Sequence, residues 1–129
     1  MSHTVKINVK FKTTEFKQLT KAFSQLGWTI NQNAHARQYS GTSPVYQHVA
    51  VNPEKGSRGY DIGITPLPTG ELDLKSDFYG GSIEKSLGKD LNKLRQEFAV
   101  ALVEDEWPNA TITRSADSAG NLLLEVEQW

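Results

Sequence analysis

Residues 59–77 read "GYDIGITPLPTGELDLKSD", and this stretch decides the fold class. Every second position is apolar or small on both sides of the turn "PLPTG": Tyr60, Ile62 and Ile64 before it, and Leu72, Leu74 and Ser76 after it. A period of two predicts a strand with one buried face, and the prolines and glycine between the two runs favour a tight connection. The stretch therefore predicts two neighbouring antiparallel strands.

The same patterns extend the prediction toward the N-terminus. Apolar residues alternate with polar ones over residues 5–12, which predicts another strand. Residues 16–26 carry apolar residues three and four apart, which predicts an amphipathic helix that Thr13 or Thr14 caps and Gly27 ends. Alternation resumes at Trp28 and Ile30, and residues 45–51 predict a further strand.

The C-terminal part predicts a second helix followed by a hairpin. Apolar residues at helical spacing run from Leu87 to Leu102, and the helix is expected to end near Trp107 because Pro108 disfavours helical geometry in the residue before it. Two short strand-like runs then flank the turn-rich "SADSAGN".

Together these elements follow the order β-α-β-β-β-β-α-β-β. The sequence thus predicts an α+β fold, a single two-layer domain over residues 1–129, with a mostly antiparallel sheet and two amphipathic helices packed on one face.

Composition narrows the classes of function. Hydrophobic residues make up 37% of the chain, and 14 Lys and Arg against 15 Asp and Glu give a net charge of -1, which disfavours a dedicated nucleic-acid binder. The absence of cysteine excludes disulfides and thiol chemistry. No apolar run reaches the length of a signal peptide or a membrane span, so a cytoplasmic protein with no membrane partner is expected.

The glycine-rich stretch "FYGGSIEKSLGK" (residues 78–89) is not a phosphate-binding loop. The spacing of Gly81 and Gly88 is wrong for one, and Lys89 is followed by Asp90, whose charge would repel phosphate. We interpret Gly80 and Gly81 as a corner between a strand and a helix that Ser82 or Ser86 caps.

The strongest candidate site lies in "HARQYSG" (residues 35–41) and "GYDIGI" (residues 59–64). Arg37 offers a planar fork of donors, Tyr39 and Tyr60 offer rigid amphipathic surface, and Asp61 accepts from arginine. Two interpretations stay open: these four residues bind a protein partner, or Arg37 pairs with Asp61 and ties an irregular loop to the sheet.

Two other sets of residues predict different functions. The first predicted strand has a basic strip, formed by Lys6, Lys10 and Lys12, and the adjoining helix adds Lys17 and Lys21. Such a strip either contacts nucleic acid or protects a sheet edge against aggregation. The second set is acidic and consists of Asp61, Asp73 and Asp77. If these residues shared one cleft, they would form a small-molecule site or the active site of a minor enzyme; otherwise they keep the surface of the sheet soluble.

No metal or cofactor is predicted. The three histidines (His3, His35 and His48) lack the spacing that directs two imidazoles to one metal ion, and no motif for a catalytic triad or a nucleotide is present. A non-enzymatic role is therefore favoured.

Several short motifs in order resemble one known family. They are the start "MSH", Leu26-Gly27-Trp28, "ARQYSG", "GYDIGI", the run from Gly70 to Asp77, "LNKLRQEFA" (residues 91–99), a turn with Gly120 and the closing Gln128-Trp129. The chain resembles, over nearly its whole length, the hypothetical chloroplast reading frame thirty-five family, a domain of unknown function from algal plastids, cyanobacteria and other bacteria.

This resemblance implies a small α+β protein without an established activity. It implies a cyanobacterial cytoplasm or a plastid stroma as the compartment, with a phage origin also conceivable. Because genes of this family can neighbour ATPases of the AAA type, it also implies an adaptor role with such an ATPase as protein partner. The sequence leaves the oligomeric state open.

Overall fold

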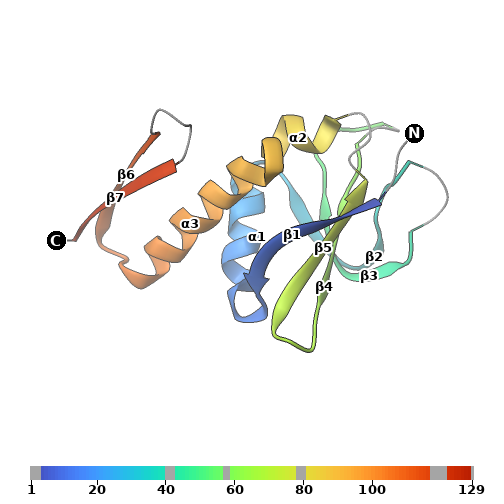
Figure 1. Ribbon diagram of the computed structural model, residues 1–129, viewed down its shortest axis with the longest axis horizontal. Helices are drawn as coiled ribbons and strands as arrows, with labels where there is room; N and C mark the ends of the chain where they lie inside the picture. Colours follow the sequence, from blue (N-terminus) through green and yellow to red (C-terminus); the bar gives the residue numbers. More distant parts are fainter. Residues whose placement is uncertain (1–3, 40–42, 57–58, 78–80, 117–121, 129) are drawn as a thin grey trace.

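The structure is a computed structural model that describes residues 4–39, 43–56, 59–77, 81–116 and 122–128 (Figure 1). Its strands are β1 (Thr4–Lys12), β2 (Thr29–His35), β3 (Val45–Val51), β4 (Ile62–Pro66), β5 (Glu71–Asp77), β6 (Ala110–Ala116) and β7 (Leu122–Gln128). Its α-helices are α1 (Phe16–Gln25), α2 (Ser82–Leu87) and α3 (Asn92–Glu106), and 3-10 turns precede α1 (Thr13–Glu15) and α3 (Lys89–Leu91). The α+β class and the predicted order of elements are confirmed, with one additional short helix.

The first five strands form one antiparallel sheet in the order β1-β5-β4-β3-β2. The pair β4–β5 comes from the stretch quoted at the outset, with Ile64 opposite Leu74 and a turn closed by a bond from the Leu67 amide to the Glu71 carbonyl, 2.8 Å. Gly70 adopts φ 89°, a conformation open mainly to glycine, which explains its place in this turn. The antiparallel pairing predicted for this stretch is confirmed.

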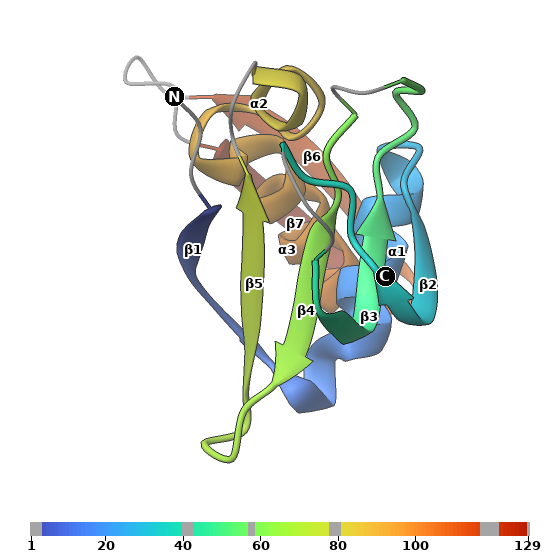
Figure 2. The same ribbon diagram turned by 90° about the vertical axis from the view of Figure 1, so that its right-hand side faces the viewer.

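The helices cover only one face of this sheet (Figure 2). The alternating apolar residues of β4 and β5 point to that face and form the core with side chains of all three helices; its fully buried members include Leu19, Phe23, Ile62, Ile64, Leu74, Ile83, Leu87 and Leu94. Each such residue removes apolar surface from water and stabilises the fold by about 2 kcal/mol. The face opposite the helices is called the outer face below.

The predicted continuous helix from Leu87 to Leu102 is wrong, because the chain breaks between α2 and α3. At the break, positive φ angles occur at Gly88 (85°), Asp90 (54°) and Leu91 (60°). This left-handed conformation costs free energy at Asp90 and Leu91, because both residues have a side chain. The apolar spacing gave no sign of the break since Leu87 and Leu91 are both buried on either side of it. The break turns the direction of the helix while both parts keep their apolar side chains in the core.

A hydrogen bond joins Trp28, the residue before β2, to α2. The indole Nε1 of Trp28 donates to Oγ of Ser86 at 2.7 Å, so Ser86 holds a core tryptophan rather than capping a helix. The N-cap of α2 is Gly81, not Ser82, and Gly80 lies outside the described residues.

Replacing Trp28 with phenylalanine is expected to lower the free energy of unfolding by about 1–2 kcal/mol, because the hydrogen bond and part of the buried ring are lost. Urea unfolding of W28F, S86A and the double variant measures this. If the bond matters, the cost of the double variant falls below the sum of the two single costs; strict additivity would contradict the prediction.

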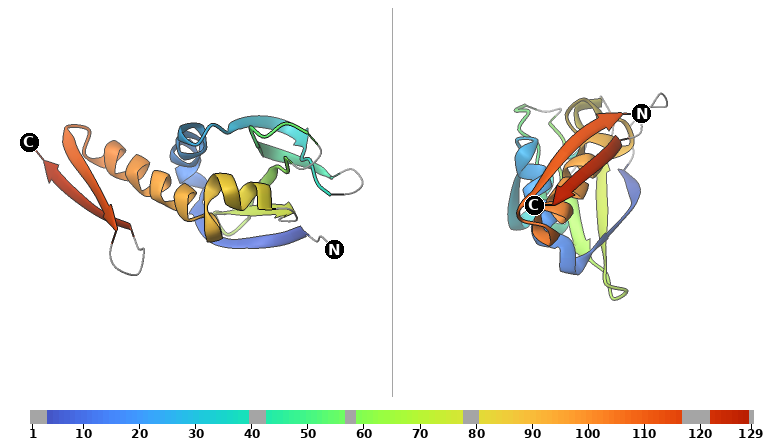
Figure 3. Two further views of the ribbon diagram at one scale, coloured as in Figure 1. Left: turned by 90° about the horizontal axis from the view of Figure 1, so that it is seen from above. Right: turned by 90° about the vertical axis from the view of Figure 1, so that its left-hand side faces the viewer.

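The C-terminal hairpin does not join the main sheet. Helix α3 ends at Glu106, just before Pro108 as predicted, and β6 and β7 then pair as a separate two-stranded sheet. Figures 1 and 3 show this hairpin at the end of the molecule remote from the main sheet. An ion pair between Arg114 on β6 and Glu97 on α3 connects the two elements.

Candidate functional site

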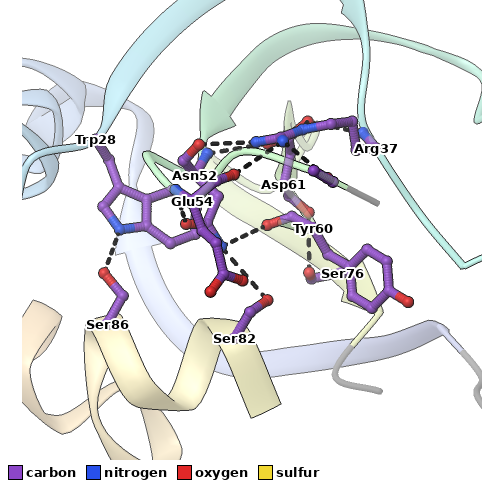
Figure 4. A network of polar contacts seen from close by, with 10 residues as sticks. Trp28, Arg37, Asn52, Glu54, Tyr60, Asp61, Ser76, Ser82 and Ser86 are labelled. Carbon is purple, nitrogen blue, oxygen red and sulfur yellow. Dashed lines mark hydrogen bonds and ion pairs between the residues drawn. The ribbon is translucent and has the colours of Figure 1, made fainter. Parts of the chain in front are cut away.

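Arg37 and Asp61 form a bidentate ion pair at the edge of the outer face (Figure 4). The Arg37 Nε lies 3.2 Å and 3.1 Å from the two Asp61 carboxylate oxygens, and Nη2 lies 2.9 Å from Oδ1. The carboxylate also accepts from the amides of Arg37, 2.7 Å, and Asn52, 2.9 Å. Asp61 is 5% exposed at its side chain, so these donors replace the water that its charge has lost.

The remaining donors of Arg37 bind backbone carbonyls. Nη1 donates to the carbonyl of Glu54 at 2.9 Å, and Nη2 donates to that of Asn52 at 2.7 Å. The guanidinium is thus occupied by partners within the chain, although its side chain is 38% exposed. The structure thus contains the Arg37–Asp61 pair of the second interpretation, which ties the Arg37 loop to the sheet, and binding of a protein partner stays a prediction.

The loop after β3 closes tightly around this ion pair. The Asn52 side-chain amide donates to the Tyr60 carbonyl at 3.1 Å, and its oxygen accepts from the Glu54 amide at 2.9 Å. At Gly59, a Cβ would lie 2.0 Å from the Glu54 carbonyl oxygen and 2.8 Å from Arg37 Nη1. Only glycine therefore lets the guanidinium and this loop come so close. We call Arg37, Asn52, Gly59 and Asp61 the Arg37–Asp61 cluster.

The cluster holds a segment that crosses the outer face. After β2 the chain doubles back in front of β3 and β4 (Figure 2), and the Asp61 amide donates to the Arg37 carbonyl at 3.1 Å. Val49 is on this outer face, because it lies opposite Gly63, yet it is fully buried. The outer face is thus partly covered by its own chain.

A tyrosine ring fills another part of the outer face. A Cβ at Gly63 would lie 2.5 Å from ring atoms of Tyr46, so the ring rests directly on the glycine backbone. Burial, and secondly the nearby Asp73 carboxylate, raise the pKa of Tyr46, so the phenol stays protonated at neutral pH.

The two tyrosines predicted to bind a partner lie in opposite environments. Tyr60 is 2% exposed and belongs to the core, so its ring is not available as contact surface in this structure. Tyr39 is 54% exposed, and Val45, beyond residues 40–42, is 58% exposed. Val45 was not among the predicted site residues.

Asp61 and Asp73, two of the three acidic residues, do not share a cleft. Asp61 is held by Arg37, whereas Asp73 on β5 is opposite Thr65 near the other end of β4 and lies 3.9 Å from Lys75 Nζ. The Asp77 side chain is outside the described residues. The hollow between Arg37, Tyr46 and Lys75 offers room for about one water molecule.

The lysine strip lies on an edge of the main sheet, because among the described strands β1 pairs only with β5. Lys12 is exposed, and Lys6 is in register with Lys75, although the side chains of Lys6 and Lys10 are outside the described residues. On α1, Lys21 lies 3.3 Å from Glu104 of α3. The edge position agrees with lysines that guard against edge-to-edge pairing, and contact with nucleic acid stays an alternative.

His35 and His48 make their contacts in different parts of the described structure. The Nδ1 of His35 lies 2.6 Å from the Ser43 carbonyl, the His48 ring stacks on Phe16 with centroids 4.1 Å apart, and His3 is outside the described residues. Among the residues that the structure describes, no three His, Asp or Glu side chains are placed to hold a metal ion.

Acid is expected to destabilise the fold through His48. Burial lowers the pKa of His48, so the unfolded chain binds this proton more readily than the folded one. The stability that the neutral ring contributes is therefore present above the unfolded pKa, about 6.5, and is lost as the pH falls below it. Urea unfolding measures the free energy of unfolding at pH 7.5 and at pH 5.5. Between these two pH values it should decrease less for H48Q than for the native chain and for H35Q; equal decreases would contradict this assignment.

Comparisons with known proteins give no relatives. No protein-family model, curated protein or solved structure matches this chain. Within the described residues, no helix combines the length and the apolar character that crossing a membrane requires.

Proposed function

We propose that this chain is a non-enzymatic adaptor that binds a protein partner through the exposed surface around Tyr39 and Val45. One observation carries the proposal: the two large apolar side chains that stand most exposed in the described structure are Tyr39, two residues after Arg37 of the Arg37–Asp61 cluster, and Val45, the first residue of β3. Tyrosine is enriched at the energetic centre of protein interfaces because it combines a large rigid ring with a polar end.

The Arg37–Asp61 cluster gives this surface a rigid support. Binding residues are often found on loops that a stable scaffold positions, since ordering the loop before binding reduces the entropy lost in the complex. Tyr39 follows Arg37 by two residues, and Arg37 makes contacts to the backbone of Asn52 and Glu54 as well as to Asp61. In this proposal Arg37 and Asp61 position the surface, and Tyr39 and Val45 contact the partner.

The size of the hollow beside Arg37 supports binding over catalysis. A site for a small substrate encloses roughly 300 Å³ or more, whereas this hollow holds about one water molecule. Two of the acidic residues that a minor enzyme would use, Asp61 and Asp73, are separated along the sheet, because Asp73 is opposite Thr65.

The family resemblance extends the proposal to a partner. If the chain is a member of the plastid and cyanobacterial family that its motifs resemble, its partner is an ATPase of the AAA type, and it acts in the cytoplasm or the plastid stroma. Affinity capture with the tagged chain from a lysate of its native host, with and without nuclease, tests this part. One dominant protein that stays bound after nuclease treatment supports the adaptor proposal. Bound nucleic acid, or loss of every partner after nuclease treatment, would instead favour nucleic-acid contact through the lysine strip.

Replacing both Tyr39 and Val45 with alanine is expected to weaken capture of that partner at least about thirtyfold, because truncating a central interface residue costs about 2 kcal/mol or more. The matched control is S24A/Q25A, two exposed residues at the end of α1. Titration of the purified partner measures both variants. Unchanged affinity for Y39A/V45A would assign the contact to another surface.

A further inference from the structure

The two edges of the main sheet differ in charge. β1 has three lysines, at positions 6, 10 and 12, whereas β2 contains no Lys, Arg, Asp, Glu or Pro. Charged residues and prolines are the usual means by which an edge strand avoids pairing with another chain. By this criterion β1 is protected and β2 is open.

The edge of β2 is also accessible. Thr29, Asn31, Gln32, Asn33 and His35 are exposed, and β3 is the only strand with which β2 pairs in the described sheet. Figure 2 shows β2 at the margin of the sheet, with α1 behind it and no segment drawn beyond its free edge. Its outward backbone donors and acceptors therefore meet solvent.

We propose that two copies of this chain pair antiparallel through their β2 strands. In a two-fold pairing each residue near the axis meets itself or a close neighbour from the other copy, so a charged edge repels itself. The uncharged β2 has no such repulsion, and the amides of Asn31, Gln32 and Asn33 each carry both donors and an acceptor, which makes the strand complementary to itself. This self-complementarity favours a second copy over a charged partner segment.

The geometry of β2 limits the possible registers. Asn33 has φ 50°, a left-handed conformation that asparagine tolerates, so the extended part of the strand is residues 29–32. We place the two-fold axis at Asn31, within this extended part, so that Asn31 is opposite its own copy and Ile30 is opposite Gln32. This register keeps like faces together, so both helix layers lie on the same side of a continuous ten-stranded sheet.

The proposal is independent of the partner-binding function, because the contact uses β2 and leaves Tyr39 and Val45 outside the paired strand. Dimers of this kind bury little surface, so a weak, concentration-dependent equilibrium is expected.

Sedimentation equilibrium of the full chain, over a hundredfold range of concentration up to about 0.5 mM, tests the pairing. We expect a monomer–dimer equilibrium whose Kd rises about fivefold or more in N31K and in N31E, where like charges face each other across the axis. An equimolar mixture of N31K and N31E should restore association, which a merely damaged fold would not do. Q47K is the matched control, since Gln47 is an exposed residue of β3, an inner strand, and it should behave as the native chain. A monomer at all concentrations, a dimer that N31K does not weaken, or a mixture that fails to recover would overturn the proposal.

Discussion

Replacing Asp61 with asparagine is expected to lower the free energy of unfolding by about 3 kcal/mol. The asparagine keeps the shape of the side chain but removes the charge that Arg37 binds, and it offers one acceptor where the carboxylate uses both oxygens. For a domain of this size the loss corresponds to a fall in Tm of about 10 °C. Urea unfolding followed by tryptophan fluorescence measures it.

A double-mutant cycle with Arg37 separates the pair from its surroundings. D61N, R37A and the double variant should give a coupling of at least about 1.5 kcal/mol, because Arg37 and Asp61 contact each other directly. Asp105 provides the control: it accepts a hydrogen bond from Gln18 in an exposed position, so D105N should cost no more than about 0.5–1 kcal/mol. Equal costs for D61N and D105N would show that burial of the pair contributes nothing.

Replacing Gly59 with alanine should cost about 3 kcal/mol, the second large effect. The new Cβ would lie 2.0 Å from the Glu54 carbonyl oxygen, which is backbone and can move only if the loop opens. An opened loop would also withdraw the carbonyl from the Arg37 guanidinium. The measurement is again urea unfolding.

Gly70 distinguishes a steric clash from the general cost of changing a glycine. A Cβ at Gly70 meets no atom within 4 Å, but its φ is 89°, so G70A should cost only about 1 kcal/mol. If G59A proved as mild as G70A, the close approach around Arg37 would not be a constraint on the fold.

The core of the fold could be predicted from periodicity. Alternation in residues 59–77 marks which side chains of β4 and β5 enter the core, and the structure buries Ile62, Ile64 and Leu74 accordingly. The break between α2 and α3 could not, because a helix and a kinked pair of helices can bury the same leucines. The positive φ angles of Asp90 and Leu91 depend on tertiary packing rather than on local preference.

The candidate site was predictable in part. Arginine and aspartate in two neighbouring segments indicated a pair, but their types alone did not decide between a binding site and an internal tie. Tyr60 shares the period of Ile62 and Ile64, and that alternation was the signal for its buried position. No signal in the sequence marked Asn52 and Gly59, because their roles depend on tertiary contacts. Asn52 donates to the Tyr60 carbonyl, and Gly59 lies against the Glu54 carbonyl and the Arg37 guanidinium.

The central claim is a division of roles, in which Arg37 and Asp61 hold the segment and Tyr39 and Val45 contact a protein. The most direct test measures Tm and partner affinity side by side for D61N and Y39A/V45A. The account predicts that D61N lowers the Tm by about 10 °C, whereas Y39A/V45A keeps the native Tm and loses the partner. The account would be contradicted if Y39A/V45A folded and bound the partner as tightly as the native chain does. It would also be contradicted if the Tm of Y39A/V45A fell as far as that of D61N.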